Sequence, residues 1–192
     1  MSFDNYTNLK KEIIDWSHRK GEDLKIPSFI TLAETKMREN ETAILDLREF
    51  ETVATDTLLT TSRVISLPAS YKSMRLVRLL LDGDLICELD YRTPKTLDAL
   101  EETGIPSFFT VTGQIELDRI PDRAYTIEFA YKSDFIPLSD SFPVNSILTN
   151  NPNVYLFGSL WALREYSQES AEADRMYARF IQEIKGANLG NI

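Results

Sequence analysis

Two residue types that build many catalytic and metal sites are almost missing from this sequence. Its 192 residues include one cysteine, Cys87, and one histidine, His18. A single cysteine excludes an intrachain disulfide and a metal cluster held by several thiolates of one chain. The seven glycines are scattered singly. This excludes a phosphate-binding loop, because such a loop needs closely spaced glycines between a strand and a helix.

Long apolar runs are missing as well. No stretch approaches the ~20 consecutive apolar residues that a helix needs to cross a bilayer. The opening MSFDNYTNLKKE lacks the apolar run of a signal peptide. We therefore expect a protein that is made and used without crossing a membrane.

The sequence has fewer basic than acidic residues, 21 against 30, and its formal net charge is −9. A negative net charge disfavours tight binding to phosphate backbones over a broad surface, although nucleic acid can pass nearby without binding. The hydrophobic content of 43%, with ten Phe and eight Tyr, excludes a disordered chain. At this length we expect one domain, or one domain with an insertion.

The titratable residues form no recognisable catalytic or metal-binding motif. We expect His18 to lie at the surface or to cap the first helix, and Cys87 to be a small core or edge residue of a strand. Asp82 and Asp84 flank a tight turn and supply too few ligands for calcium. Composition leaves open a carboxylate pair of the glycoside hydrolase type, but Glu101–Glu102 fit a helix end. The sequence therefore predicts no enzyme, no cofactor and no metal site.

The segment Thr149–Ser167, TNNPNVYLFGSLWALREYS, is the predicted centre of the fold. Asn150 and Asn151 suit the cap of a helix, and Pro152 suits its first turn. The residues that follow are apolar around almost the whole circumference, and such a helix belongs inside other elements. Gly158 and its small neighbours should let a second backbone approach closely.

Two N-terminal helices are predicted from apolar residues that recur at three- and four-residue steps. The first spans about Asn5–Ser17, with Asp4 or Asn5 as its cap. The second begins at Ile26. We expect the polar face of the second helix to be exposed to solvent; this face carries Glu34, Lys36, Arg38 and Glu39.

A final helix is predicted after a break at Ser167–Ser170; it ends at Gly186 and is followed by a mobile tail, residues 187–192. Each outer pair of helices is amphipathic and cannot bury its apolar stripe alone. We therefore expect two N-terminal and two C-terminal helices to pack as a four-helix bundle, residues 1–50 and 140–186. Deleting the tail should leave the melting behaviour nearly unchanged.

The middle of the chain, residues 51–139, is the predicted β module. Asp82-Gly83 between two apolar runs indicates a hairpin, and Gly113 marks a second one. Alternate residues from Tyr125 to Tyr131 are apolar, which is typical of a half-buried strand. We also expect a short helix from Thr93 to about Glu102. The predicted fold class is therefore α+β, a four-helix bundle with an inserted antiparallel β module.

Apolar residues lie on both faces of the predicted strand that contains Leu79 and Leu81. A strand of a two-layer module needs only one apolar face, so either another subunit or the helical bundle covers the second. In the tail, Leu189 and Ile192 are either frayed or held in a groove of a partner. These four residues are the candidate partner contacts.

Three stretches carry a resemblance to a known family. They are IPSFITLAETKMRE in the second helix, LPASYKSMRLVRLLLDG at the first hairpin, and the long segment from IPSFFTVTGQIELD to YLFGSLWALREY. The order of these stretches and their residue patterns resemble those of the head–tail connector adaptors of tailed bacteriophages. The specific resemblance is to the adaptor type with a β insertion found in short-tailed phages.

This resemblance implies a structural virion protein at the portal vertex, assembled in the host cytoplasm. It implies a ring, a dodecamer, that binds the portal protein, extends the DNA channel and provides the platform for tail or nozzle proteins. Double-stranded DNA would pass through without specific binding. The alternative function is a carbohydrate- or receptor-binding module that uses the β insertion; the aromatic residues that suggest it are Tyr91, Phe108, Phe109 and Tyr131.

Overall fold

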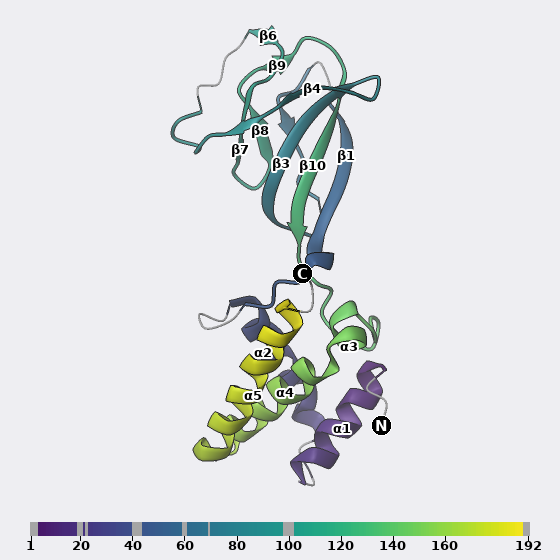
Figure 1. Cartoon of the computed structure of the whole chain (residues 1–192), viewed down its shortest axis with the longest axis vertical. Coiled ribbons are helices and arrows are strands. Elements are labelled where there is room, and N and C mark those ends of the chain that lie inside the picture. Colours follow the sequence, from purple (N-terminus) through teal and green to yellow (C-terminus); the bar gives the residue numbers. More distant parts are fainter. Residues whose placement is uncertain are drawn as a thin grey trace. The chain divides into compact units, whose positions relative to one another are not determined.

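Helices and strands separate into two units along the chain. The computed structural model describes residues 4–18, 21, 23–39, 44–58, 61–68, 70–97 and 102–189. One unit, called the helical unit below, comprises Met1–Arg48 and Phe135–Ile192; the other, the β unit, comprises Glu49–Asp134. Figure 1 shows the helices of the first unit and the strands of the second.

The predicted fold class is wrong in both of its parts. The described residues form five α-helices, not four, and ten strands in three sheets rather than one antiparallel module. The helices are α1 (Tyr6–Ser17), α2 (Ile26–Glu39), α3 (Ser146–Asn150), α4 (Pro152–Tyr166) and α5 (Ser170–Leu189), with 3-10 turns η1 (Asp23–Lys25) and η2 (Arg48–Phe50).

The central helix α4 is buried from several sides, as its sequence predicts. It contacts α1, α2, α3 and α5, and every residue from Val154 to Leu160 is buried. An added Cβ at Gly158 would lie 2.8 Å from Phe180 and 2.9 Å from the Cβ of Ala33. The absence of a side chain at Gly158 therefore allows both α2 and α5 to approach α4 closely.

The extra helix, α3, forms because Asn145 caps it. The side-chain oxygen of Asn145 accepts the backbone N–H of Leu148 at 2.9 Å, which satisfies a donor that the first turn of a helix leaves without a backbone partner. The chain then bends at Asn151, and α4 begins at Pro152. Sequence periodicity missed α3 because it has only five residues.

The last helix continues three residues beyond the predicted end at Gly186 and reaches Leu189. Ala187 is buried. The side chain of Asn188 accepts the backbone N–H of Asp46 at 2.8 Å and donates to the carbonyl of Ile44 at 2.9 Å. These contacts hold the helical conformation where the sequence indicated a mobile tail. Residues 190–192 lie outside the described part of the chain.

The β unit contains strands paired in both directions. The sheet orders are β1-β10-β3-β4, β2-β8-β7-β5 and β6-β9, of which β5/β7 and β6/β9 are parallel pairs. The bounds are β1 (Glu51–Leu58), β2 (Val64–Ile65), β3 (Tyr71–Leu81), β4 (Asp84–Glu88), β5 (Asp90–Tyr91), β6 (Thr103–Gly104), β7 (Phe108–Val111), β8 (Ile115–Leu117), β9 (Ile120–Pro121) and β10 (Tyr125–Ser133).

Both predicted hairpins are confirmed. Asp82 and Gly83 have φ angles of 54° and 91°, and they join β3 to β4 in an antiparallel pair. Positive φ at both turn positions matches the right-handed twist of the two strands. Gly113 lies in the turn between β7 and β8, which also pair antiparallel.

The predicted helix from Thr93 to Glu102 is wrong in its described part. One turn forms, with the N–H groups of Thr96 and Leu97 bonded to the carbonyl of Thr93 at 2.8 and 3.0 Å. Residues 98–101 lie outside the described ranges, and the chain re-enters as strand β6. The parallel pairing of β6 with β9 then takes Thr103 and Gly104 into a sheet.

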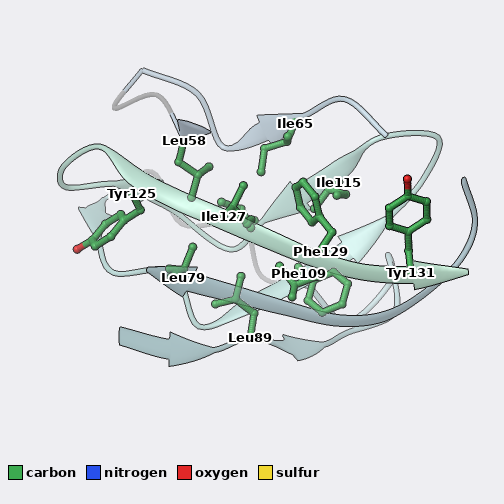
Figure 2. Close-up of a cluster of buried hydrophobic side chains, with 12 residues drawn as sticks. Leu58, Ile65, Leu79, Leu89, Phe109, Ile115, Tyr125, Ile127, Phe129 and Tyr131 are labelled. Atoms are coloured by element: carbon green, nitrogen blue, oxygen red, sulfur yellow. The ribbon is translucent and has the colours of Figure 1, made fainter. Parts of the chain in front are cut away.

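The core of the β unit lies between the inner faces of its two larger sheets. Alternate residues of β10 from Tyr125 to Tyr131 are buried, as the period-two pattern predicts. Figure 2 shows these side chains beside those from neighbouring strands. The buried cluster comprises Leu58, Ile65, Val77, Leu79, Leu89, Phe109, Ile115, Leu117, Tyr125, Ile127, Phe129 and Tyr131.

Candidate interaction surfaces

The only histidine of the sequence, His18, has a structural role at the end of a helix. His18 adopts a left-handed conformation with φ 53° at the C-terminal end of α1, and its N–H donates to the carbonyl of Asp15 at 3.3 Å. The prediction of a capping residue is confirmed. Among the residues that the structure describes, no group of three or more His, Cys, Asp or Glu side chains is placed to hold a metal ion.

Cys87 lies half-buried in β4, with its sulfur 3.7 Å from the carbonyl of Pro106. Burial raises the pKa of the Cys87 thiol, and the charge of Asp118 raises this pKa further. The protonated thiol is the weaker nucleophile. Cys87 is therefore a packing residue, as its sequence surroundings indicate.

The candidate partner contacts Leu79 and Leu81 belong to the inner side of the sheet. Leu79 is 0% exposed, so its own subunit already covers it completely. Leu81 packs against the same core cluster and is half-buried. Leu189 is 68% exposed on α5, while Ile192 lies outside the described residues. The sequence predicts apolar residues on both faces of β3, and the pairing with β10 places Leu79 on the inner face. Whether these residues contact a partner stays a prediction.

The outward residues of the sheet β1-β10-β3-β4 form the outer sheet face. Its apolar members are Val53, Leu76, Leu80, Leu85 and Ile86, of which Val53, Leu85 and Ile86 are exposed. Val53 and Leu76 both lie opposite Ala130, and Leu85 lies opposite Leu80. Two short apolar rows therefore lie on this face, one over β1, β10 and β3 and the other over β3 and β4.

A charged row separates these two apolar rows. Arg78 lies between Glu88 of β4 and Glu128 of β10, at 3.7 and 3.6 Å from their carboxylates. Because one arginine is paired with two carboxylates, this row carries a net negative charge. The outer sheet face therefore combines exposed aliphatic side chains with a line of charge.

A second surface is an open hollow in the β unit with a volume of about 400 Å³, called the aromatic hollow below. It is lined by Tyr71, Met74, Arg75, Tyr91, Phe109 and Val111. The rings of Tyr91 and Phe109 meet at 5.6 Å in an edge-on arrangement. The hydroxyl of Tyr71 accepts the N–H of Met74 at 3.0 Å, which fixes this wall of the hollow.

The aromatic hollow contains two of the four residues that suggested a carbohydrate-binding site. Tyr91 and Phe109 line it. Phe108 lies under the guanidinium of Arg92 at 4.5 Å, and Tyr131 is buried. Sequence reasoning missed Tyr71, Met74 and Arg75, because a bulge between β3 and β10 places Arg75 without an opposite residue.

A third surface is the segment of residues 135–145 in the helical unit, called the anchored loop below. The buried carboxylate of Glu34, 2% exposed, accepts the backbone N–H of Leu138 at 2.8 Å. Asn145 donates to the carbonyl of Ile136 at 2.9 Å. Pro143 accepts the N–H of Tyr6 at 2.7 Å. The loop is therefore tied to α1 and α2.

The burial of Glu34 corrects the prediction of a solvated polar face on α2. Its neighbours on that face remain accessible: Glu39 is exposed, and Lys36 and Arg38 are half-buried. Arg38 places its guanidinium 4.0 Å from the ring centre of Phe135. Two of the four charged residues of α2, Glu34 and Arg38, therefore hold the chain where it re-enters the helical unit.

A model of the SU10 adaptor protein family matches residues 4–191, almost the whole chain. The chain belongs to this phage head–tail adaptor family. The resemblance found in the sequence is thus confirmed. No curated protein sequence matches the adaptor.

Membership of this family indicates the class of protein. A structural phage adaptor family implies a non-enzymatic virion component that associates with portal and tail proteins. Within the described ranges, no helix combines the length and the apolar character needed to span a bilayer.

Proposed function

We propose that the adaptor forms a ring of twelve copies on the portal protein, extends the DNA channel and provides the platform for tail or nozzle proteins. The observation that carries this proposal is the family match over residues 4–191. The surfaces described above supply what such an assembly needs, namely exposed apolar side chains on an otherwise well-packed protein.

A closed ring needs a head-to-tail interface built from two different patches of each copy. The outer sheet face, the aromatic hollow and the anchored loop are three separate candidates for these patches. Leu81 and Leu189 remain proposed partner contacts. Weak contacts between copies gain strength when a preformed portal ring binds several copies at once.

The negative charge of the chain suits a channel through which DNA slides. Each copy carries a formal net charge of −9, so a ring concentrates negative charge around its axis. Phosphate groups are repelled over a range set by the Debye length, about 8 Å at physiological salt. DNA then passes without specific binding, and assembly takes place in the host cytoplasm before the ring becomes part of the virion.

The proposal is tested by mixing the purified chain with the portal protein from its own genome. We expect a monomeric or weakly associated free chain, and rings on the portal, as measured by light scattering and negative-stain microscopy. A portal from an unrelated phage is the matched control and should stay bare. Failure to bind the cognate portal would refute the proposal.

A further inference from the structure

The anchored loop displays apolar side chains although it is firmly held. Ile136, Phe142 and Val144 are exposed, with Phe142 at 55%. An exposed aromatic ring on a fixed loop has an unfavourable contact with water and loses little conformational freedom when it binds. These are the properties of a preorganised docking element.

A tight turn holds Asp140 two residues before Phe142 in the chain. The N–H of Ser139 donates to the carbonyl of Phe142, and the N–H of Phe142 donates to the hydroxyl of Ser139, both at 3.0 Å. Asp140 lies within this turn. Its side chain is 86% exposed and forms an ion pair with Lys10 at 3.2 Å. The loop thus carries an exposed aromatic side chain and, two residues earlier, an exposed carboxylate that is paired with Lys10.

The aromatic hollow has the complementary chemistry. Its walls are apolar and aromatic, and its volume of about 400 Å³ falls in the range of protein pockets that bind ligands. Its charged member is Arg75, whose exposed partner Glu51 lies at 3.3 Å. β4 pairs with β3 only from Arg78 to Leu81, and the residues of β3 that line the hollow, Tyr71, Met74 and Arg75, precede this paired part.

We propose that the anchored loop of one copy docks into the aromatic hollow of a second copy, with the ring of Phe142 in the hollow and Asp140 facing Arg75. This inference rests on the ring of the proposed function. Every copy carries both surfaces, and the two surfaces differ, as a head-to-tail interface requires. Exposed ion pairs contribute little, so Asp140 and Arg75 exchange their present partners at small cost.

Cross-linking between two different full-length variants tests the contact directly. One chain carries Asp140→Cys and the other Arg75→Cys, both with Cys87→Ser. Only contact between copies can join them, and we expect the joined pair when the two are mixed at high concentration, with or without portal. A variant that carries both Asp140→Cys and Arg75→Cys serves as the comparison. If this double variant cross-links only within one chain and the mixture gives no joined pair, the inference is overturned.

Ring assembly on the portal supplies the second readout. Phe142→Ala, Tyr91→Ala and Arg75→Glu should each raise the chain concentration needed for rings by at least ~10-fold, because central aromatic and arginine residues dominate binding. Asp140→Arg combined with Arg75→Glu should recover assembly relative to either change alone. Ile105→Ala, at an exposed apolar position of the β unit outside the three surfaces, is the matched control and should assemble normally. Circular dichroism melts confirm that each variant is folded.

The outcomes separate this inference from the proposed function. If the wild-type chain forms no ring on its portal, the proposed function fails, and cross-linking of the free chains still decides the inference. If rings form and the Phe142 and Arg75 variants assemble normally, the inference fails alone. A glycan array signal that Tyr91→Ala abolishes and Phe142→Ala leaves unchanged would assign the hollow to carbohydrate and overturn the proposal.

Discussion

The hydroxyl of Tyr155 donates a hydrogen bond of 2.9 Å to the carboxylate of Glu34. Tyr155 is 0% exposed, and it also accepts a hydrogen bond from Asn145 at 2.7 Å. The same Glu34 oxygen accepts the N–H of Leu138. One buried carboxylate therefore connects α2, α4 and the anchored loop.

Replacing Glu34 by alanine should lower the free energy of unfolding by about 2–4 kcal/mol, because it leaves the Leu138 N–H and the Tyr155 hydroxyl without their acceptor. Glu34→Gln keeps an acceptor oxygen and should cost less. Urea unfolding measures both, with Glu39→Ala on the exposed part of α2 as control. A Glu34→Ala variant as stable as wild type would contradict the network.

Tyr155 should make the stability fall at alkaline pH. Burial raises the pKa of Tyr155, and the nearby Glu34 charge raises it further. Folding therefore favours the neutral phenol, and this contribution is fully present below pH ~10, the pKa of an unfolded tyrosine. It is lost progressively as the pH rises from there toward the raised pKa of the folded state.

Urea unfolding between pH 8 and 11.5 measures this effect. Tyr155→Phe should have a shallower loss of stability above pH ~10 than wild type, since no proton is released at that position. The pH dependence that remains in Tyr155→Phe includes the contributions of Tyr6 and Tyr125, because burial raises the pKa of these two residues as well. A slope for Tyr155→Phe equal to that of the wild type would refute the prediction.

Two helix glycines should respond to alanine in opposite ways. At Gly158 the new Cβ meets Phe180 and Ala33 below 3.0 Å, so the variant should lose about 1–3 kcal/mol through overpacking. At Gly186 nothing lies within 4 Å, so alanine should stabilise α5 by about 0.5–1 kcal/mol. Thermal unfolding decides, and a Gly158→Ala protein at least as stable as wild type would show that α4 is not tightly packed there.

Asn188 should stabilise the fold although it lies near the end of the chain. Asn188→Ala loses the bonds to Asp46 and Ile44, and the expected loss is about 1–2 kcal/mol. Leu189→Ala removes an exposed side chain and should melt like wild type. Deleting residues 187–192 should therefore lower the melting temperature, contrary to the expectation from sequence. An unchanged melting temperature would mean that these two bonds add nothing.

The sequence predicts elements well where one pattern dominates locally. The apolar circumference of α4 places it at the centre, and the alternation from Tyr125 to Tyr131 gives both the strand and its buried face. The turn residues Asp82-Gly83 predict their hairpin because positive φ is needed there. In each case the cause lies within a few residues along the chain.

The misses concern partners that are distant along the chain. Nothing near Glu34 indicates that Leu138, more than 100 residues later, supplies its hydrogen bond. Nothing near Asn188 indicates the contact with Asp46. On β3, Leu79 and Leu80 are equally apolar, so only the pairing with β10 decides which one lies inside. The aromatic hollow likewise exists only after β3, β5 and β7 come together.

The first residue of β1, Glu51, lies opposite Lys132 near the end of β10. The chain therefore enters and leaves the β unit through neighbouring strand ends. In evolutionary terms, a single insertion event is enough to add this unit to a helical ancestor, and a single deletion is enough to remove it. The order of the helices along the chain is the same with or without the β unit.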